Sequence, residues 1–110
     1  MEINEEKKGQ TVVLSVSGRL DSTNSSELET KVFSLITRNE KSILIDCSRL
    51  SYVSSSGLRI FLMGLKKMST AKGRFALCSL QETVKEIFDI SGFTGIFAIY
   101  KSQQEALSSM

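Results

Sequence analysis

The residues whose types and spacing are best suited to chemistry form a short serine turn, Ser54-Ser55-Ser56-Gly57. An apolar stretch that predicts a strand comes before the turn, and an apolar helix is expected to begin directly after it. Several hydroxyl groups are therefore placed where unpaired backbone N–H groups meet the positive end of a helix dipole. Negative charge is favourable at such a position, either as a bound phosphate or as a phosphate added to a serine.

The residues of the serine turn allow four interpretations. Ser54 is able to cap the helix, with the other serines acting only as small residues in a tight turn. A second interpretation is a phosphate-ligand site, although the turn lacks the Gly-x-x-x-x-Gly-Lys-Ser/Thr and Gly-x-Gly-x-x-Gly patterns. A third is a nucleophilic serine, but Val53 stands where a Gly-x-Ser-x-Gly elbow around Ser55 requires glycine. The fourth is phosphorylation of a serine by another protein.

Phosphorylation of the serine turn is expected to act differently on the fold and on partner binding. A phosphate adds about −1.5 to −2 charges at pH 7, and a helix N-terminus stabilises an anion by roughly 0.3–1 kcal/mol. At an interface with an acidic partner, the same charge meets like-charge repulsion of several kcal/mol. Because the second effect is larger, we expect the modification to leave the fold intact and to abolish partner binding.

The composition excludes several kinds of active site. The chain contains no histidine, so it cannot assemble a Ser–His–Asp or Cys–His catalytic unit by itself. Its two cysteines, Cys47 and Cys78, lie in strand-like stretches, which indicates reduced thiols in a core. Two isolated cysteines without histidine also make a poor metal site. We therefore expect no metal and no cofactor.

Basic residues are concentrated in one part of the chain. The net charge is only +2, yet the segment 49–74 contains no acidic residue. Its cations either lie solvated, or form a basic surface beside the serine turn that faces an acidic partner. Nucleic-acid binding is not expected, because no aromatic residues are interleaved with these charges. The basic residues of the segment are Arg49, Arg59, Lys66, Lys67, Lys72 and Arg74.

The length of 110 residues indicates one domain over residues 1–110. The N-terminal residues are not followed by an apolar run, so no signal peptide is predicted. No window approaches the roughly 18 apolar residues that a membrane-spanning helix needs. We therefore expect a cytoplasmic protein that does not associate with a membrane.

Predicted strands and helices alternate in the order β-β-α-β-α-β-α-β-α, which indicates an α/β domain with parallel central strands. Asn24 is expected to cap the first helix, with Glu27 reaching back to it. Gly64 indicates a close helix–strand contact, and Ile90 is expected among the inward residues of the third helix. The predicted strands cover residues 2–8, 11–17, 42–47, 74–78 and 96–100, and the predicted helices cover residues 25 to about 38, 55–69, 81–91 and 103–108.

Four stretches in register resemble the STAS-domain anti-sigma factor antagonists of bacteria. Gly18-Arg19-Leu20-Asp21 is similar to the family's Gly-x-Leu-Asp after the second strand, and residues 43–48 are similar to its strand ending in Asp-Leu-Ser. Residues 52–58 resemble the family's phosphorylation turn, which usually reads Asp-Ser-Ser/Thr/Ala-Gly-Leu. Residues 87–93 resemble the end of its third helix. The resemblance covers nearly the whole chain and implies a single STAS domain, a small mixed sheet with helices mainly on one face.

The resemblance also implies partner switching as the mechanism. In this mechanism the unphosphorylated antagonist binds an anti-sigma factor that is also a GHKL-type serine kinase, and binding frees the sigma factor for transcription. The kinase phosphorylates the antagonist, which then dissociates, and a PP2C-type phosphatase restores it. The protein is then a substrate and regulator in bacterial signalling, and not an enzyme.

Functional residues of the family carry over to individual positions of this chain. Ser55 aligns with the phosphoacceptor, and the neighbouring serines are alternates because Ser54 replaces the usual aspartate. Gly57 is expected to let a partner approach the helix start. Asp21 matches an acidic residue near the interaction surface, although it also fits a simple turn aspartate. The expected partner-binding residues are Asp21, Ser54, Ser56, Gly57 and Arg59.

Two other functions are compatible with the sequence. One is a constitutive STAS binding module of a signalling or lipid-transport assembly that is never phosphorylated. The other is a sensor that binds a small molecule or a nucleotide phosphate at the same helix start. The intact Ser55-Ser56-Gly57 favours the phospho-regulated antagonist over both.

Overall fold

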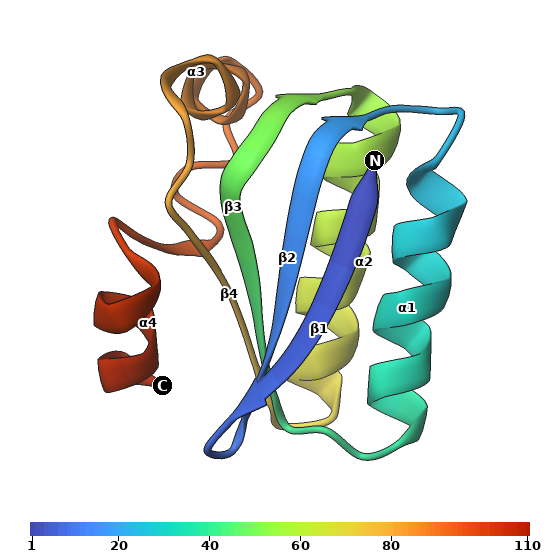
Figure 1. Cartoon of the computed structure of the whole chain (residues 1–110), viewed down its shortest axis with the longest axis vertical. Helices are drawn as coiled ribbons and strands as arrows, with labels where there is room; N and C mark the ends of the chain where they lie inside the picture. Colours follow the sequence, from blue (N-terminus) through green and yellow to red (C-terminus); the bar gives the residue numbers. More distant parts are fainter.

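The computed structural model describes residues 1–110 as one five-stranded sheet with helices packed on it (Figure 1). The strands lie in the order β1-β2-β3-β4-β5, with β1 antiparallel to β2 and all other neighbours parallel. The predicted α/β class, mixed sheet and order of elements are confirmed. The elements are β1 (Glu2–Lys8), β2 (Thr11–Leu20), α1 (Ser25–Thr37), β3 (Ser42–Val53), α2 (Ser55–Thr70), β4 (Arg74–Cys78), α3 (Glu82–Ile90), β5 (Ala98–Tyr100) and α4 (Gln103–Ser109).

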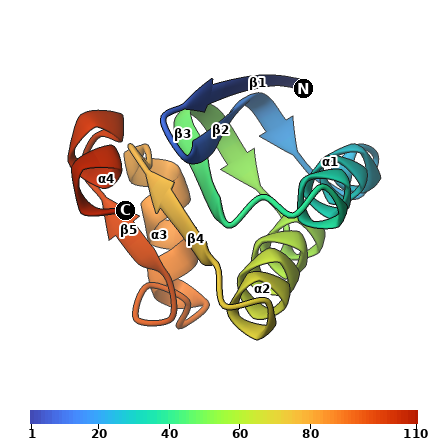
Figure 2. The same cartoon turned by 90° about the horizontal axis from the view of Figure 1, so that it is seen from below.

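The two faces of the sheet are covered unequally (Figures 1 and 2). The first three helices pack on one face, where alternate residues of the strands join them in the main core. α4 packs on the opposite face against β4 and β5, so the helices lie mainly on one face, as predicted. The smaller core under α4 consists of Val13, Leu44, Ala76, Cys78 and Ala106.

β2 and β3 continue beyond their predicted ends. They remain paired in parallel as far as Leu20 and Val53, with two register shifts on the way. Residues 48–51 contain exposed polar side chains that interrupt the apolar pattern of β3, which is why the sequence suggested an earlier end. The extension matters for function because it places the ends of both strands next to each other.

The outer part of β3 has no strand beside it on the β4 side, because β4 ends opposite Asp46. Two side chains from the start of α3 take over the hydrogen bonds of this part of the backbone. Gln81 Nε2 donates to the Ser48 carbonyl at 2.8 Å, and Thr83 Oγ1 donates to the Ser51 carbonyl at 3.3 Å. α3 therefore stabilises the path that β3 follows toward the serine turn.

The expected cap of the first helix is wrong in detail. Asn24 does precede α1, but its side chain forms no hydrogen bond with the helix. Instead its Oδ1 accepts from the Asp21 N–H at 3.0 Å, and its Nδ2 donates to the Arg19 carbonyl at 2.8 Å. The side chain therefore stabilises the turn between β2 and α1, because turn backbone groups compete with helix N–H groups for a short amide side chain.

The prediction that Ile90 points inward is also wrong, since this side chain is 87% exposed. Ile90 lies six residues after the buried Val84, which rotates it about 240° around the helix axis and away from the buried stripe. β5 begins at Ala98 rather than at residue 96, because Ile96 is held in a turn by Phe93.

The close contact predicted at Gly64 is confirmed. A Cβ on this buried residue would lie 2.7 Å from Cε2 of Phe75 in β4. The missing side chain therefore lets α2 approach the sheet closely. No helix in the structure combines the length and the apolar character needed to cross a membrane.

Candidate functional site

The serine turn lies at the carboxyl end of β3, where the chain enters α2 (Figure 1). β2 ends beside β3, and the Ser54 N–H donates to the Leu20 carbonyl at 2.9 Å. The turn after each of these parallel strands therefore lies at the same edge of the sheet. In this way the fold brings together the serine turn and Asp21, which directly follows Leu20.

The three serines of the turn differ in what their hydroxyl groups do. Ser54 is extended, and its Oγ accepts from the Gly57 N–H at 3.3 Å, which confirms it as the helix cap. Ser55 is the first residue of α2, its side chain is exposed, and its hydroxyl has no hydrogen-bond partner within the protein. Ser56 is half-buried. Ser55 therefore presents the hydroxyl that is most accessible to another protein.

The cap predicts a difference in stability between two neighbouring serine variants. Ser54→Ala removes the acceptor for the Gly57 N–H, so we expect it to lower the free energy of unfolding by about 1 kcal/mol. Ser56→Ala removes a hydroxyl without a side-chain hydrogen bond, so we expect little change. Urea unfolding of both variants measures this difference, and equal losses would show that the cap contributes nothing.

The structure shows a packing role for Gly57. This glycine is buried, and an added Cβ would lie 2.7 Å from Val53 Cγ2 and 2.8 Å from Leu20 Cγ. The space that a side chain would occupy is filled by the ends of β2 and β3. Gly57 therefore serves the internal packing of the helix start.

Asp21 is held in a turn of its own. Its Oδ1 accepts from the Thr23 hydroxyl at 2.6 Å and from the Thr23 N–H at 3.0 Å. These two hydrogen bonds hold the pKa of the Asp21 carboxyl below its usual value, and the bond from the Thr23 hydroxyl has the larger effect. The carboxylate is therefore ionised at neutral pH, and it lies partly exposed at the same sheet edge as the serine turn.

The basic residues of segment 49–74 do not form one surface. Arg59, Lys66 and Lys67 are exposed on α2 and border a shallow cleft beside Leu62 and Met63. None of these three cations forms an ion pair. We call them the α2 cations.

The remaining basic residues of the segment lie elsewhere. Arg49 lies on the opposite face of the sheet, where it borders the polar groove described below. Lys72 and Arg74 follow the end of α2, and Arg74 Nη1 donates to the Ser109 carbonyl at 2.9 Å. The prediction of a basic surface beside the serine turn therefore applies only to the α2 cations.

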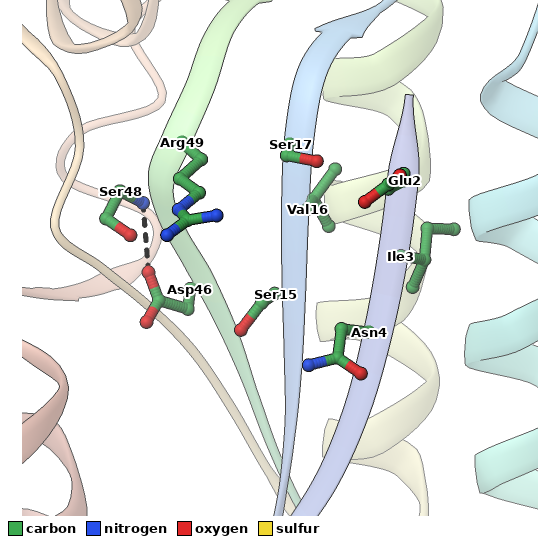
Figure 3. A pocket seen from close by; sticks show the side chains of 9 residues that line it. All are labelled: Glu2, Ile3, Asn4, Ser15, Val16, Ser17, Asp46, Ser48 and Arg49. Carbon is green, nitrogen blue, oxygen red and sulfur yellow. Dashed lines mark hydrogen bonds between the residues drawn. The ribbon is translucent and has the colours of Figure 1, made fainter.

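A polar groove of about 580 Å³ lies on the sheet face opposite α1 and α2, in the part that α4 leaves uncovered (Figure 3). Side chains from β1, β2 and β3 line it, and it includes no residue of the serine turn. The groove was not predicted, although Ser15 and Ser17 alternate with buried residues in β2 and mark a polar face. Its lining residues are Glu2, Ile3, Asn4, Ser15, Val16, Ser17, Asp46, Ser48 and Arg49.

Asp46 connects this groove to α4. Its Oδ1 accepts from the Ser48 N–H at 2.9 Å and its Oδ2 accepts from Gln103 Nε2 at 2.6 Å. The aspartate is buried with both carboxylate oxygens bonded. It therefore helps to hold α4 on the sheet.

The cysteines are free, buried core residues, as predicted. Cys47 belongs to the core on the face of α1–α3, whereas Cys78 belongs to the smaller core under α4. Burial raises the pKa of Cys47 and raises the pKa of Cys78 to about 11, so both are protonated thiols at neutral pH. Histidine, cysteine, aspartate and glutamate side chains nowhere gather in groups of three that could hold a metal ion.

Comparisons with known proteins agree with this architecture. The sequence pattern of the STAS domain family matches residues 2–106. BtrV of Bordetella bronchiseptica, assigned as an anti-sigma factor antagonist, is 31% identical over 109 residues, which cover 99% of this chain and 94% of BtrV.

Two structures of SpoIIAA also align. The unphosphorylated anti-sigma factor antagonist has 25% identity and a TM-score of 0.85, over 98% of this chain and 95% of that one. The phosphorylated Bacillus cell fate determinant has 24% identity and a TM-score of 0.77, over 98% of each chain.

Proposed function

The chain belongs to the STAS domain family, and we propose that it is an anti-sigma factor antagonist controlled by phosphorylation of Ser55. In the unphosphorylated state it binds an anti-sigma factor and so releases a sigma factor. One observation carries the assignment of Ser55: its hydroxyl is exposed and unbonded at the first residue of α2. The similarity to BtrV and to SpoIIAA, an anti-sigma factor antagonist with structures in the unphosphorylated and phosphorylated forms, supports the proposal.

The proposed partner is a GHKL-type anti-sigma factor with serine kinase activity. In the transfer step, Ser55 Oγ attacks the γ-phosphorus of the ATP that the kinase holds, the bond to the leaving ADP breaks, and the hydroxyl proton passes to a base of the kinase. This chain has no histidine and supplies only the acceptor hydroxyl. In this scheme the chain is a substrate and not an enzyme, and a PP2C-type phosphatase in the same cytoplasm hydrolyses the phosphoserine.

Electrostatics explains how phosphorylation ends binding. Asp21 already places one negative charge at this edge of the sheet, and a phosphate on Ser55 adds about −1.5 to −2 more. An acidic group of the kinase that lies beside Ser55 and Arg59 then meets repulsion of several kcal/mol. The start of α2 tolerates the phosphate, because unpaired N–H groups and the helix dipole favour an anion there. Binding is lost while the fold is kept.

Binding measurements test the proposed function directly. The GHKL-type kinases encoded in the genome that contains this gene are purified one by one and titrated with the chain by calorimetry. We expect one kinase to bind the unphosphorylated chain and to release it after phosphorylation. If no kinase binds, or if binding is unchanged by phosphorylation, the proposed function is wrong.

The α2 cations predict a salt-dependent association rate. Lys66 and Lys67 are exposed and form no ion pair, although Lys67 Nζ lies 5.0 Å from the centroid of the Phe33 ring. Changing both to glutamate should slow association with an acidic partner roughly tenfold at low salt. The effect should shrink at high salt, where exposed charges are screened. Stopped-flow association rates at two salt concentrations measure it. Arg49→Glu, a single charge reversal on the other face of the sheet, is the control for position and should slow association much less. An unchanged rate in the Lys66→Glu/Lys67→Glu variant would contradict the prediction.

A further inference from the structure

We infer, on the basis of the proposed function, that Arg59 is the residue that pairs with a phosphate on Ser55. Phosphorylation then has two effects on the partner surface. It adds negative charge, and it withdraws the nearest free cation from the partner. Arg59 thereby sets how strongly the two states of the chain differ in binding.

The helix geometry places the two side chains together. Ser55 and Arg59 are both exposed and lie four residues apart in α2. Side chains at this spacing are neighbours on a helix surface, with Cβ atoms about 5–6 Å apart. Helical side chains also lean toward the N-terminus of their helix, so the long, flexible Arg59 side chain can reach back to the turn that contains Ser55. A guanidinium offers two parallel N–H groups to two phosphate oxygens.

Arg59 is free to form this pair. It has no ion pair in the structure, either with Asp21 at the same edge or with any other carboxylate. Arg19, the other arginine near this edge, is stacked on the Tyr52 ring, with its guanidinium carbon 4.2 Å from the ring centroid. The guanidinium of Arg59 is therefore the one at this edge without a partner.

Distance excludes the other α2 cations from this role. Lys66 and Lys67 lie 11 and 12 residues after Ser55, so they are about 16–18 Å further along the helix axis. That distance is about twice the screening length of roughly 8 Å in physiological salt. Arg59 is only about 6 Å further along the axis. The same phosphate therefore interacts strongly with Arg59 and weakly with the lysines.

The pairing has a consequence for each state of the chain. Without phosphate, Arg59 is exposed beside the acceptor hydroxyl and is available to an acidic group of the partner. With phosphate, the charge of Arg59 is neutralised within the helix, while the negative charge of Asp21 at the same sheet edge remains. The partner then loses an attraction at the position where it gains a repulsion.

A phosphorus NMR titration tests the pairing without any kinase. Phosphoserine is incorporated at position 55 by genetic encoding, in the otherwise unchanged chain and in Arg59→Gln, Arg59→Lys and Lys66→Gln. A paired guanidinium favours the dianion, so the second pKa of the phosphate should be about 0.2–0.4 pH unit lower with Arg59 than in Arg59→Gln. Arg59→Lys should restore part of the shift, and Lys66→Gln should not differ from the unchanged chain.

Two results would overturn the inference. One is an equal phosphate pKa with Arg59 and in Arg59→Gln, which would show that no pair forms. The other is an equal change in Arg59→Gln and Lys66→Gln, which would show a general charge effect instead of a specific pair. This titration needs no partner, so a negative result counts only against the pairing of Arg59 with the phosphate. The proposed function is refuted separately, by a kinase that leaves Ser55 unmodified.

Binding of the unphosphorylated chain tests the consequence for the partner. With the kinase identified above, Arg59→Gln should bind several-fold more weakly than the unchanged chain, and phosphorylation should reduce its affinity by a smaller factor. Unchanged affinity of unphosphorylated Arg59→Gln would show that the partner does not use Arg59. Circular dichroism confirms that this exposed substitution leaves the fold intact.

Discussion

Ser55→Asp is expected to bind the anti-sigma factor kinase roughly 30-fold more weakly than the wild-type chain, while it folds normally. Aspartate carries about half the charge of a phosphate at pH 7. Like-charge contacts at an interface cost several kcal/mol, so we expect the aspartate to reduce the binding free energy by about 2 kcal/mol, which corresponds to a roughly 30-fold weaker affinity. The fold is unaffected because an acidic residue at the start of α2 is favoured by the helix dipole. Calorimetric titration gives the affinity, and thermal unfolding reports the stability.

Two control variants make this result specific. Ser55→Ala removes the acceptor without adding charge, so it should bind as the unphosphorylated chain does and should stay bound in the presence of ATP. Ser108→Asp adds the same charge on α4, which packs on the opposite face of the sheet, and should not affect binding. Equal affinity of Ser55→Asp and wild type would show that charge at this position does not control docking.

Phe88→Ala is expected to cause the largest loss of stability. The side chain is fully buried, and its ring centroid lies 6.0 Å from that of Phe61 in α2 and 5.7 Å from that of Phe97. Removing such a ring from a core costs about 3–5 kcal/mol, out of the roughly 5–15 kcal/mol that stabilise a typical domain. Urea unfolding measures the loss.

The matched control for Phe88→Ala lies in the same helix. Ile90→Ala removes an apolar side chain that is 87% exposed, so we expect a change of less than about 0.5 kcal/mol. Similar losses in the two variants would contradict the assignment of the buried face of α3.

Much of the fold could be predicted from periodicity. The short apolar run of residues 43–47 and the spacing of buried residues in α1 and α2 report local burial. The outer half of β3 could not be predicted, because its hydrogen-bond partners, Gln81 and Thr83, come from a distant helix. The predicted cap by Asn24 was wrong for a related reason. The path of the turn between β2 and α1 brings the backbone groups of Arg19 and Asp21 to the Asn24 side chain.

The candidate site was predictable in position but not in detail. The sequence placed three serines at the start of a helix, and only the Ser54–Gly57 hydrogen bond reveals which hydroxyl is already used. The role of Gly57 depends on Leu20, which the chain brings to it only through the pairing of β2 with β3. The division of the basic residues between α2 and the opposite sheet face likewise requires the three-dimensional arrangement.

Mass spectrometry after phosphorylation tests the central claim most directly. The wild-type chain and Ser55→Ala are incubated with the kinase that binds the chain and with ATP, and modified peptides are sequenced by fragmentation. We expect a single phosphate on Ser55 of the wild-type chain and none on Ser55→Ala. A chain that stays unmodified, or a phosphate located on Ser54 or Ser56 instead, would contradict the account.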